Sequence, residues 1–362
     1  MAADEMETDV LVLGAGSAGL YALPEIKKAG KRFLMANGGP MGTTCARVGC
    51  MPSKVLIQAA EDLHRKGALA GEGIRGGGAL AGDPALAMEH VREIRDTLVG
   101  RLLDKTVPKL GDRLLEGYGR FREPGLVELE DGRRIRAGAT VIAAGSRPVV
   151  PGPWKEAFGD RLLTTDTLFE QETLPRRMAV LGLGAIGLEM GQALARLGIE
   201  VVGVDMLETI GGLQDPEVNR VAVDAVSAEF PCWLGAKAEL EEAGDGGITV
   251  RAGSNEAVVD KVLVCLGRRP NTDTLDLPAL GLDLDDRGMP GWNPETGQVA
   301  DLPVFIAGDV NGHRAFLHEA GIEGRIAGWN AARWPEAPTR FERPPTLAVT
   351  FCDPNVAQVG ES

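Results

Sequence analysis

The chain of 362 residues is poor in aromatic side chains and has few cysteines and histidines. Aromatic residues make up only 4% of it, whereas glycine occurs 49 times, a balance typical of α/β proteins with many tight turns. It also lacks an uninterrupted apolar run of the roughly 20 residues that a membrane span needs. Basic residues are in deficit, and the net charge of −14 argues against nucleic acid or an anionic membrane as a partner.

Cysteine usage and the first residues indicate a cellular compartment. The segment 1–9 is acidic, unlike a secretory signal or an Arg-rich transit segment, so we expect a cytoplasmic protein. Five cysteines, an odd number in a long chain, fit a reducing environment with one catalytic disulfide. Cys232, Cys265 and Cys352 stand among apolar residues and are predicted to pack in the core. No second Cys or His pair has ligand spacing, so no metal site is expected.

What the chain does contain is a pair of cysteines, Cys45 and Cys50, followed by a Pro-Ser-Lys sequence that ends at Lys54. On a regular helix, two residues five positions apart are separated by about 7.5 Å along the axis and point about 140° apart, which does not suit a disulfide. Gly49 and Pro52 therefore predict an irregular loop up to Cys50 and a helix that begins there. A thiol at a helix N-terminus is favoured as the thiolate. Two unrelated buried cysteines are the alternative.

A dinucleotide-binding fingerprint, Gly14-x-Gly16-x-x-Gly19, precedes the cysteines. An apolar strand leads into it, and a helical stretch and a second strand follow. The glycines permit a tight turn and let backbone amides approach a pyrophosphate at the helix N-terminus. Asn37 stands where an Asp or Glu usually binds the ribose hydroxyls, and its amide oxygen can accept that hydrogen bond without charge. Pro24 inside the expected helix is irregular.

A second fingerprint, Gly182-x-Gly184-x-x-Gly187, also lies between an apolar strand and a helical stretch. The next strand ends in Asp205, whose carboxylate can bind a ribose 2′-hydroxyl and would repel a 2′-phosphate. No Arg or Lys follows Asp205 closely. This site therefore favours NAD(H) over NADP(H).

These motifs resemble the flavoprotein disulfide reductases, class I of the pyridine nucleotide disulfide oxidoreductases and the family of dihydrolipoamide dehydrogenase, glutathione reductase and mercuric reductase. Residues 140–148 resemble the segment that closes the first half of the family's flavin domain. Residues 304–310 resemble its second flavin motif, in which Asp309 would bind the ribityl chain. Residues 263–271 resemble the exit from the nicotinamide domain. The resemblance, most of all to dihydrolipoamide dehydrogenase, implies FAD and NAD as cofactors and electron flow from nicotinamide through flavin to a disulfide.

The same resemblance implies an α/β fold of two Rossmann-like, three-layer dinucleotide-binding domains, the second inserted in the first. The expected limits are 1–150 for the first part of the FAD-binding domain, 151–271 for the NAD-binding domain, 272–345 for the second part of the FAD-binding domain and 346–362 for the start of a dimerisation domain.

Two segments outside the fingerprints are also assigned. Apolar positions at helical spacing predict an amphipathic helix over 84–110, and the Gly/Ala-rich segment 67–82 is predicted to be a loose linker. Beyond the point that matches the end of this chain, family members continue for on the order of 100 residues, a length typical of one domain. We therefore expect a C-terminally truncated chain that lacks the family's His–Glu acid–base dyad. The full-length protein would be a homodimer and this fragment a monomer or a differently built dimer, with disulfide reduction slower by roughly 10²–10⁴-fold.

The resemblance also implies the site residues. Cys45 would exchange with the substrate, Cys50 would be the thiolate beside the flavin, and Lys54 would pair with Glu189 near flavin N5; two solvated helix charges are the alternative for that pair. The implied FAD-binding residues are Gly14, Gly16, Ser17, Ala18, Gly19, Asn37, Gly38, Thr44, Lys54, Ala144, Gly145, Ser146, Gly308 and Asp309. The implied NAD-binding residues are Gly182, Gly184, Ala185, Ile186, Gly187, Glu189, Asp205 and Gly267.

Three functions stay open. The first is oxidation or reduction of a lipoyl-type disulfide. The second is reduction of mercuric ion or another disulfide, because Ala46 and Arg47 stand where dihydrolipoamide dehydrogenases have a larger apolar residue and Asn. The third is a flavin-binding redox sensor without turnover, which NADH would bleach slowly or not at all.

Overall fold

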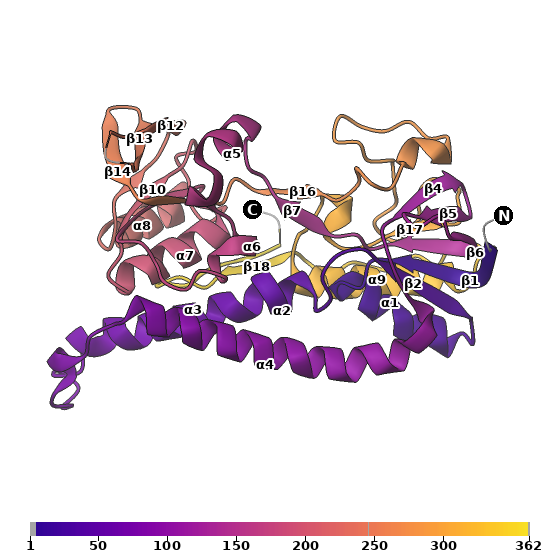
Figure 1. The fold of residues 1–362 in the computed structure, drawn as a ribbon, viewed down its shortest axis with the longest axis horizontal. Helices are drawn as coiled ribbons and strands as arrows, with labels where there is room; N and C mark the ends of the chain where they lie inside the picture. Colours follow the sequence, from indigo (N-terminus) through magenta and orange to yellow (C-terminus); the bar gives the residue numbers. More distant parts are fainter. Residues whose placement is uncertain (1–4, 245, 361–362) are drawn as a thin grey trace. The chain divides into compact units, whose positions relative to one another are not determined.

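The computed structural model describes residues 5–244 and 246–360, which form two compact units (Figure 1). Unit 1 is built from the segments Met1–Cys45, Leu98–Arg147 and Arg268–Pro344, and unit 2 from Ala46–Thr97, Pro148–Gly267 and Pro345–Ser362. The first four residues of the acidic N-terminal segment and the last two of the expected dimerisation domain lie outside the described residues.

Unit 1 is organised around a mostly parallel sheet in which β1 is central. Val10 and Val12 of this strand pack on the helices α1 and α9, whereas Leu11 and Leu13 pack on the opposite face. Such a strand is buried on both faces, as parallel strands in layered α/β folds are. The sheet order is β3 (Leu114–Glu116), β2 (Phe33–Asn37), β1 (Glu5–Leu13), β6 (Arg134–Ile142), β5 (Leu126–Leu129) and β4 (Gly119–Glu123), and β17 (Val304–Ile306) also pairs with β6.

Helices α1 (Ser17–Lys28) and α9 (Leu317–Ala331) lie side by side in unit 1 (Figure 1). Glycines on α9 allow this close approach: a Cβ on Gly324 would lie 2.2 Å from the Ala18 carbonyl oxygen. Helix α4 (Pro84–Leu110) has the ends expected from the sequence, and its last residues belong to unit 1.

Unit 2 contains a second parallel sheet and the second fingerprint. Val180 faces α7 and α3, while Ala179 and Leu181 face the antiparallel strands. The parallel order is β11 (Cys232–Trp233), β10 (Glu200–Val204), β9 (Arg177–Leu181), β15 (Lys261–Val264) and β8 (Leu162–Leu163). The antiparallel strands are β12 (Glu239–Glu242), β13 (Ile248–Ala252) and β14 (Asn255–Val259), and a hairpin joins β18 (Leu347–Thr350) to β19 (Val356–Val359).

The remaining elements are short or connect the sheets. The helices are α2 (Thr44–Val48), α3 (Cys50–His64), α5 (Gly152–Phe158), α6 (Thr165–Leu168), α7 (Ala185–Arg196) and α8 (Pro216–Ser227), and β7 (Ser146–Pro148) pairs with β16 (Arg268–Pro270). Single 3₁₀ turns occur at Arg65–Gly67, Gly77–Ala79, Gly111–Arg113, Gly159–Arg161, Leu277–Leu280 and Asp309–Asn311.

One local expectation is wrong. The chain before Cys50 is not an irregular loop, because α2 places Cys45 in a helical turn of its own. No glycine or proline interrupts residues 44–48, so a turn can form, and Gly49 then breaks the helix with φ −130° and ψ −118°. The expected start of a helix at Cys50, with Pro52 in its first turn, is confirmed.

Two further features concern the organisation of the chain. The structure groups residues 46–97 with residues 148–267, whereas the family resemblance implies that 46–97 belong to the first part of the FAD-binding domain. The domain limits remain predictions. No helix within residues 5–244 and 246–360 combines the length and apolar character of a membrane span.

Candidate active site

The glycines of the first fingerprint have distinct structural roles. Gly14 has φ +111°, and a Cβ there would lie 2.3 Å from the Ala143 carbonyl oxygen. A Cβ on Gly19 would lie 2.0 Å from the Gly14 carbonyl oxygen. By contrast, a Cβ on Gly16 would meet no heavy atom within 4 Å. Gly14 and Gly19 are thus required by the fold itself, and Gly16 leaves open space before the first turn of α1.

The second fingerprint repeats this arrangement. Gly182 has φ +90°, and a Cβ there would lie 2.4 Å from the Cys265 carbonyl oxygen, whereas one on Gly187 would lie 1.8 Å from the Gly182 carbonyl oxygen. A Cβ on Gly184 would again meet nothing within 4 Å. Gly16 and Gly184 are the N-caps of α1 and α7, and neither helix has an acidic residue in its first turn. Both cradles fit a pyrophosphate, because the amides of a helix N-terminus attract an anion.

Asn37 and Asp205 occupy matching positions beside the two loops. The Asn37 Oδ1 accepts a hydrogen bond from the Ala15 N–H at 3.0 Å, and the Asp205 Oδ2 accepts one from the Leu183 N–H at 2.7 Å. The Asn37 Nδ2 donates to the Gly39 carbonyl at 2.6 Å. Each side chain therefore braces its own glycine loop. Their contacts with ribose remain predictions.

Two segments implied in flavin binding meet within unit 1, together with residues 268–271 from the segment that resembles the exit of the nicotinamide domain. The Ser146 hydroxyl donates to the Asp309 Oδ2 at 2.8 Å. The Arg268 Nε donates to the Ser146 Oγ, and its Nη2 donates to the Ser146 carbonyl, both at 2.8 Å. The Asn271 Nδ2 also donates to the Ala144 carbonyl at 2.9 Å. Arg268 was not among the expected site residues, and its place directly after Gly267 is the one signal that could have found it.

A buried glutamate holds the loop that carries Asp309. The Glu323 Oε2 accepts hydrogen bonds from the Gly308 N–H at 2.8 Å and from the Asn311 Nδ2 at 2.7 Å. Burial raises the pKa of Glu323, while the Gly308 N–H and the Arg343 guanidinium act in the opposite direction. Nothing in the sequence motifs pointed to Glu323, which lies on α9.

The five cysteines fall into two groups. Cys45 and Cys50 are partly exposed and stand on either side of the break at Gly49. Burial raises the pKa of Cys232 to about 11 and that of Cys265 to about 12, so both are inert thiols near neutral pH. Burial also raises the pKa of Cys352. These three pack on the apolar core of unit 2, as expected. The described part of the chain holds no group of three His, Cys, Asp or Glu residues arranged for a metal ion.

Lys54 and Glu189 meet in unit 2. The Lys54 Nζ lies 2.6 Å from the Glu189 Oε2, and the Glu189 side chain is only 9% exposed. Phe351 joins them: its backbone N–H donates to the Glu189 Oε1 at 3.0 Å, and the Lys54 Nζ lies 4.5 Å from the centre of its ring. The sequence motifs did not indicate Phe351, because it follows β18 far along the chain.

The other predicted cofactor residues lie on the same loops and helix ends. Gly38 lies against Tyr118, and a Cβ there would come within 2.4 Å of the ring. Ser17 and Ala18 open α1, Ala185 and Ile186 open α7, Thr44 opens α2, Gly145 follows β6, and Gly267 accepts a hydrogen bond from the Val149 N–H at 3.0 Å.

Two Rossmann-like units, each with an open glycine cradle at a helix N-terminus, define a protein that binds two dinucleotides. Residues 8–334 match the model of the pyridine nucleotide-disulphide oxidoreductase family, and the chain belongs to that family. Its members use FAD and NAD(P).

Curated relatives cover nearly the whole chain. The chain is 31% identical to dihydrolipoyl dehydrogenase 2 of Haloarcula marismortui, spanning 98% of this chain and 76% of that protein. It is 33% identical to dihydrolipoyl dehydrogenase of Thermus scotoductus over 90% and 70%, and 31% identical to mercuric reductase of Lysinibacillus sphaericus over 99% and 65%. Among solved structures, the fold resembles the HOCl-induced flavoprotein disulfide reductase RclA from Escherichia coli, with a TM-score of 0.82 at 20% identity over 98% of this chain and 77% of that one.

Proposed function

We propose that this protein is an FAD-dependent oxidoreductase that passes electrons between NAD(H) and a disulfide or dithiol through Cys45 and Cys50. The observation that carries the proposal is the position of Cys50 as the first residue of α3, one helical turn before Lys54. Lys54 in turn forms an ion pair with Glu189. The helix N-terminus favours the Cys50 thiolate, and the paired ammonium adds a held positive charge on the same helix.

Cys45 and Cys50 can reduce a substrate disulfide in two exchange steps. In the dithiol state, the Cys45 thiolate attacks one sulfur of the substrate disulfide and expels the other sulfur as a thiolate, which leaves a mixed disulfide. The Cys50 thiolate then attacks the Cys45 sulfur, closes the Cys45–Cys50 disulfide and expels the second substrate thiolate. Each expelled thiolate takes up a proton from water to become the product thiol. FAD, when bound, supplies the two-electron chemistry that links hydride from the nicotinamide to this disulfide.

The nucleotide is NAD rather than NADP. Asp205 directly follows β10, and its carboxylate braces the second glycine loop, so a 2′-phosphate placed there would meet a like charge. The substrate is a lipoyl-type disulfide, in line with the dihydrolipoyl dehydrogenase relatives. Mercuric ion is the second candidate, supported by the mercuric reductase relative and by Arg47 on α2. A cytoplasmic location and, for the full-length protein, a homodimer complete the proposal.

Anaerobic titration of the FAD-loaded protein with NADH tests the redox pair. We expect rapid loss of flavin absorbance and a long-wavelength band from the Cys50 thiolate beside the flavin. Cys45→Ser should retain this band and Cys50→Ser should lose it, while Cys232→Ser, a partly buried thiol outside the proposed pair, should behave as the native protein. A band that persists in Cys50→Ser, or a flavin that NADH does not bleach, would contradict the proposal. Turnover with lipoamide or with Hg²⁺ then separates the two substrates.

A further inference from the structure

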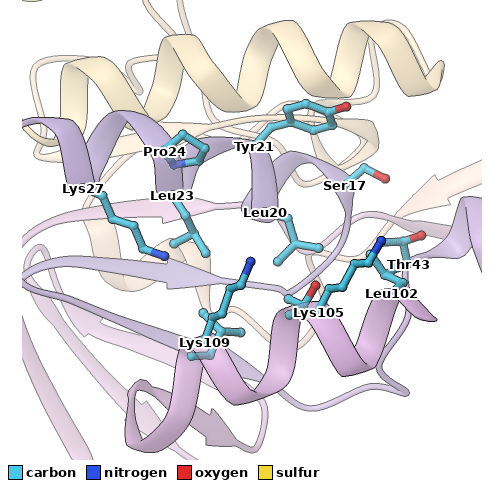
Figure 2. Close-up of a pocket in the computed structure, with 12 residues that line it drawn as sticks. Ser17, Leu20, Tyr21, Leu23, Pro24, Lys27, Thr43, Leu102, Lys105 and Lys109 are labelled. Atoms are coloured by element: carbon cyan, nitrogen blue, oxygen red, sulfur yellow. The ribbon is translucent and has the colours of Figure 1, made fainter. Parts of the chain in front are cut away.

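Unit 1 contains an open cavity of about 520 Å³ between α1 and the last turns of α4 (Figure 2). It begins near Ser17 and Thr43 and reaches Lys27 at the end of α1. Ten helical residues separate Ser17 from Lys27, which is about 15 Å along the axis. The far end of the cavity therefore lies well away from the glycine cradle of the first fingerprint.

The walls of the cavity are apolar along its length. Leu20, Leu23 and Pro24 line it from α1, and Leu102 and Leu110 line it from α4. Leu110 is buried in the core of unit 1, whereas Leu102 is half-buried at the rim. Such a lining can cover an alkyl chain, with a gain of about 0.8 kcal/mol for each buried CH₂ group.

The far end of the cavity is cationic. Lys27 and Lys109 line it, and Figure 2 shows both extending into the space between the two helices, whereas Lys105 lies beside Thr43 nearer to Ser17. No carboxylate lines the cavity, and these three lysines make no ion pair among the described residues; Glu25 pairs with Lys28 instead. Partial burial lowers the pKa of Lys27, and Arg113 and Lys109 lower it further by repulsion.

Unneutralised lysines are unexpected in a chain with a net charge of −14. A lysine in the last turn of a helix complements the helix dipole, and this explains Lys27 on α1 and Lys109 on α4 when each helix is considered alone. It does not account for two helices that direct these ammonium groups at one another across an apolar cavity. A dianionic group placed between them would replace this repulsion with attraction.

We propose that this cavity binds a small amphipathic phosphate, with its headgroup between Lys27 and Lys109 and its alkyl chain along the leucines of α1 and α4. The headgroup end of this cavity is separate from both dinucleotide cradles, whereas Ser17 of the first cradle lines its opposite end. The proposal does not depend on the proposed redox function. The phosphate could be carried by a free alkyl phosphate or by a lipid in a membrane, and the two sources share the headgroup chemistry.

Calorimetric titration of the FAD-saturated protein with decyl phosphate tests the site. We expect binding that weakens about tenfold or more in the double variant K27Q/K109Q, because two charge-assisted contacts are lost. Lys28→Gln is the matched control, since Lys28 lies on the same helix but pairs with Glu25, and it should bind within about twofold of the native protein. If the double variant fails to fold, as judged by circular dichroism, Lys109→Gln alone serves.

Three outcomes would overturn the proposal: no binding of decyl phosphate, equal binding by the lysine variants, or displacement by FAD, which would make the cavity part of the cofactor site. Co-sedimentation with phosphatidate vesicles assigns the source. Lysine-dependent sedimentation supports a membrane lipid, and binding of decyl phosphate without sedimentation supports a free phosphate. Flavin bleaching by NADH should be unchanged throughout, so failure here is distinguishable from failure of the redox proposal.

Discussion

At the scale of single residues, the pair Lys54 and Glu189 depends on a third group. Glu189 is nearly buried, and its two oxygens accept from different partners: Oε2 from the Lys54 ammonium and Oε1 from the Phe351 N–H. The Lys54 ammonium also lies over the Phe351 ring, 4.5 Å from its centre. A buried carboxylate needs such partners, because leaving its lone pairs unsatisfied is costly. The segment that follows β18 is therefore a structural part of this site.

Phe351→Leu should remove the ring–ammonium contact and leave the backbone hydrogen bond in place. We expect the free energy of unfolding to fall by about 0.5–1 kcal/mol beyond the loss of packing, measured by urea denaturation in a double-mutant cycle with Lys54→Met. Phe351→Pro also removes the N–H and should cost roughly 1–3 kcal/mol more. A coupling energy of zero between positions 54 and 351 would contradict the role given to the ring.

At the scale of elements, each strand–loop–helix unit contains two glycines that the fold needs and one glycine whose Cβ position is open space, where we propose that a ligand binds. Gly187 lies against the Gly182 carbonyl, so any side chain there forces α7 away from β9. Gly184 caps α7 and faces open space. The same division holds for Gly19 and Gly16 on α1.

Gly184→Ala should therefore fold with nearly native stability but bind NADH more weakly, because the new methyl occupies the space of the pyrophosphate. Gly187→Ala should instead destabilise unit 2, since overpacking of this kind costs about 1–3 kcal/mol or more. Thermal melts without nucleotide and fluorescence titration with NADH separate the two effects. Equal nucleotide affinity in Gly184→Ala and the native protein would show that the open space is not the binding site.

Strands β4, β5 and β6 share an ion-pair cluster around Glu128. Hydrogen bonds from three arginines lower the pKa of Glu128 to about 2 from an ordinary value of 4.5. Arg122 has the largest effect, and Arg120 and Arg134 add to it. A carboxylate with a lowered folded-state pKa contributes stability fully above its unfolded pKa and loses it as the pH falls towards its folded pKa. This contribution is thus present at neutral pH and declines between about 4.5 and 2.

Glu128→Gln should be less stable than the native protein at pH 7, and this difference should shrink as the pH falls below 4.5. Urea denaturation of both proteins from pH 7 to pH 3.5 measures the difference. A difference that stays constant with pH would indicate that the cost of the substitution comes from packing rather than from charge.

At the scale of the whole molecule, both units are discontinuous in sequence. Unit 1 is assembled from three chain segments and unit 2 from three others. Ordering the first fingerprint, the Ser146–Asp309 contact and the Glu323 contact thus requires residues from all three segments of unit 1. A ligand that binds across these loops stabilises the assembled unit by mass action.

Removal of FAD should accordingly lower the melting temperature, and adding it back should raise it in a concentration-dependent manner. At a free FAD concentration of about 100 times Kd the expected gain is about 2.7 kcal/mol. Differential scanning calorimetry across a series of FAD concentrations gives the measurement. Melting temperatures that do not respond to FAD would show that the folded chain does not hold the cofactor.

The sequence motifs by themselves determined the strand and helix of each fingerprint and the start of the helix at Cys50. Local geometry is enough for this: a glycine that needs positive φ, an apolar strand and a helical stretch are neighbours in sequence, so β1–α1, β9–α7 and the start of α3 at Cys50 could be predicted. The helix that carries Cys45 was missed because one short turn forms or fails by small energy differences that no motif records.

Only the tertiary structure decided which residues support the site. Arg268 meets Ser146, Glu323 meets Gly308, and Phe351 meets Glu189, although the two partners differ in residue number by 15 to 162. The lysines of α1 and α4 face one cavity for the same reason. Such contacts arise from the packing of sheets and helices. Residue spacing does not indicate which distant side chain completes a hydrogen bond or which charged groups face the same cavity.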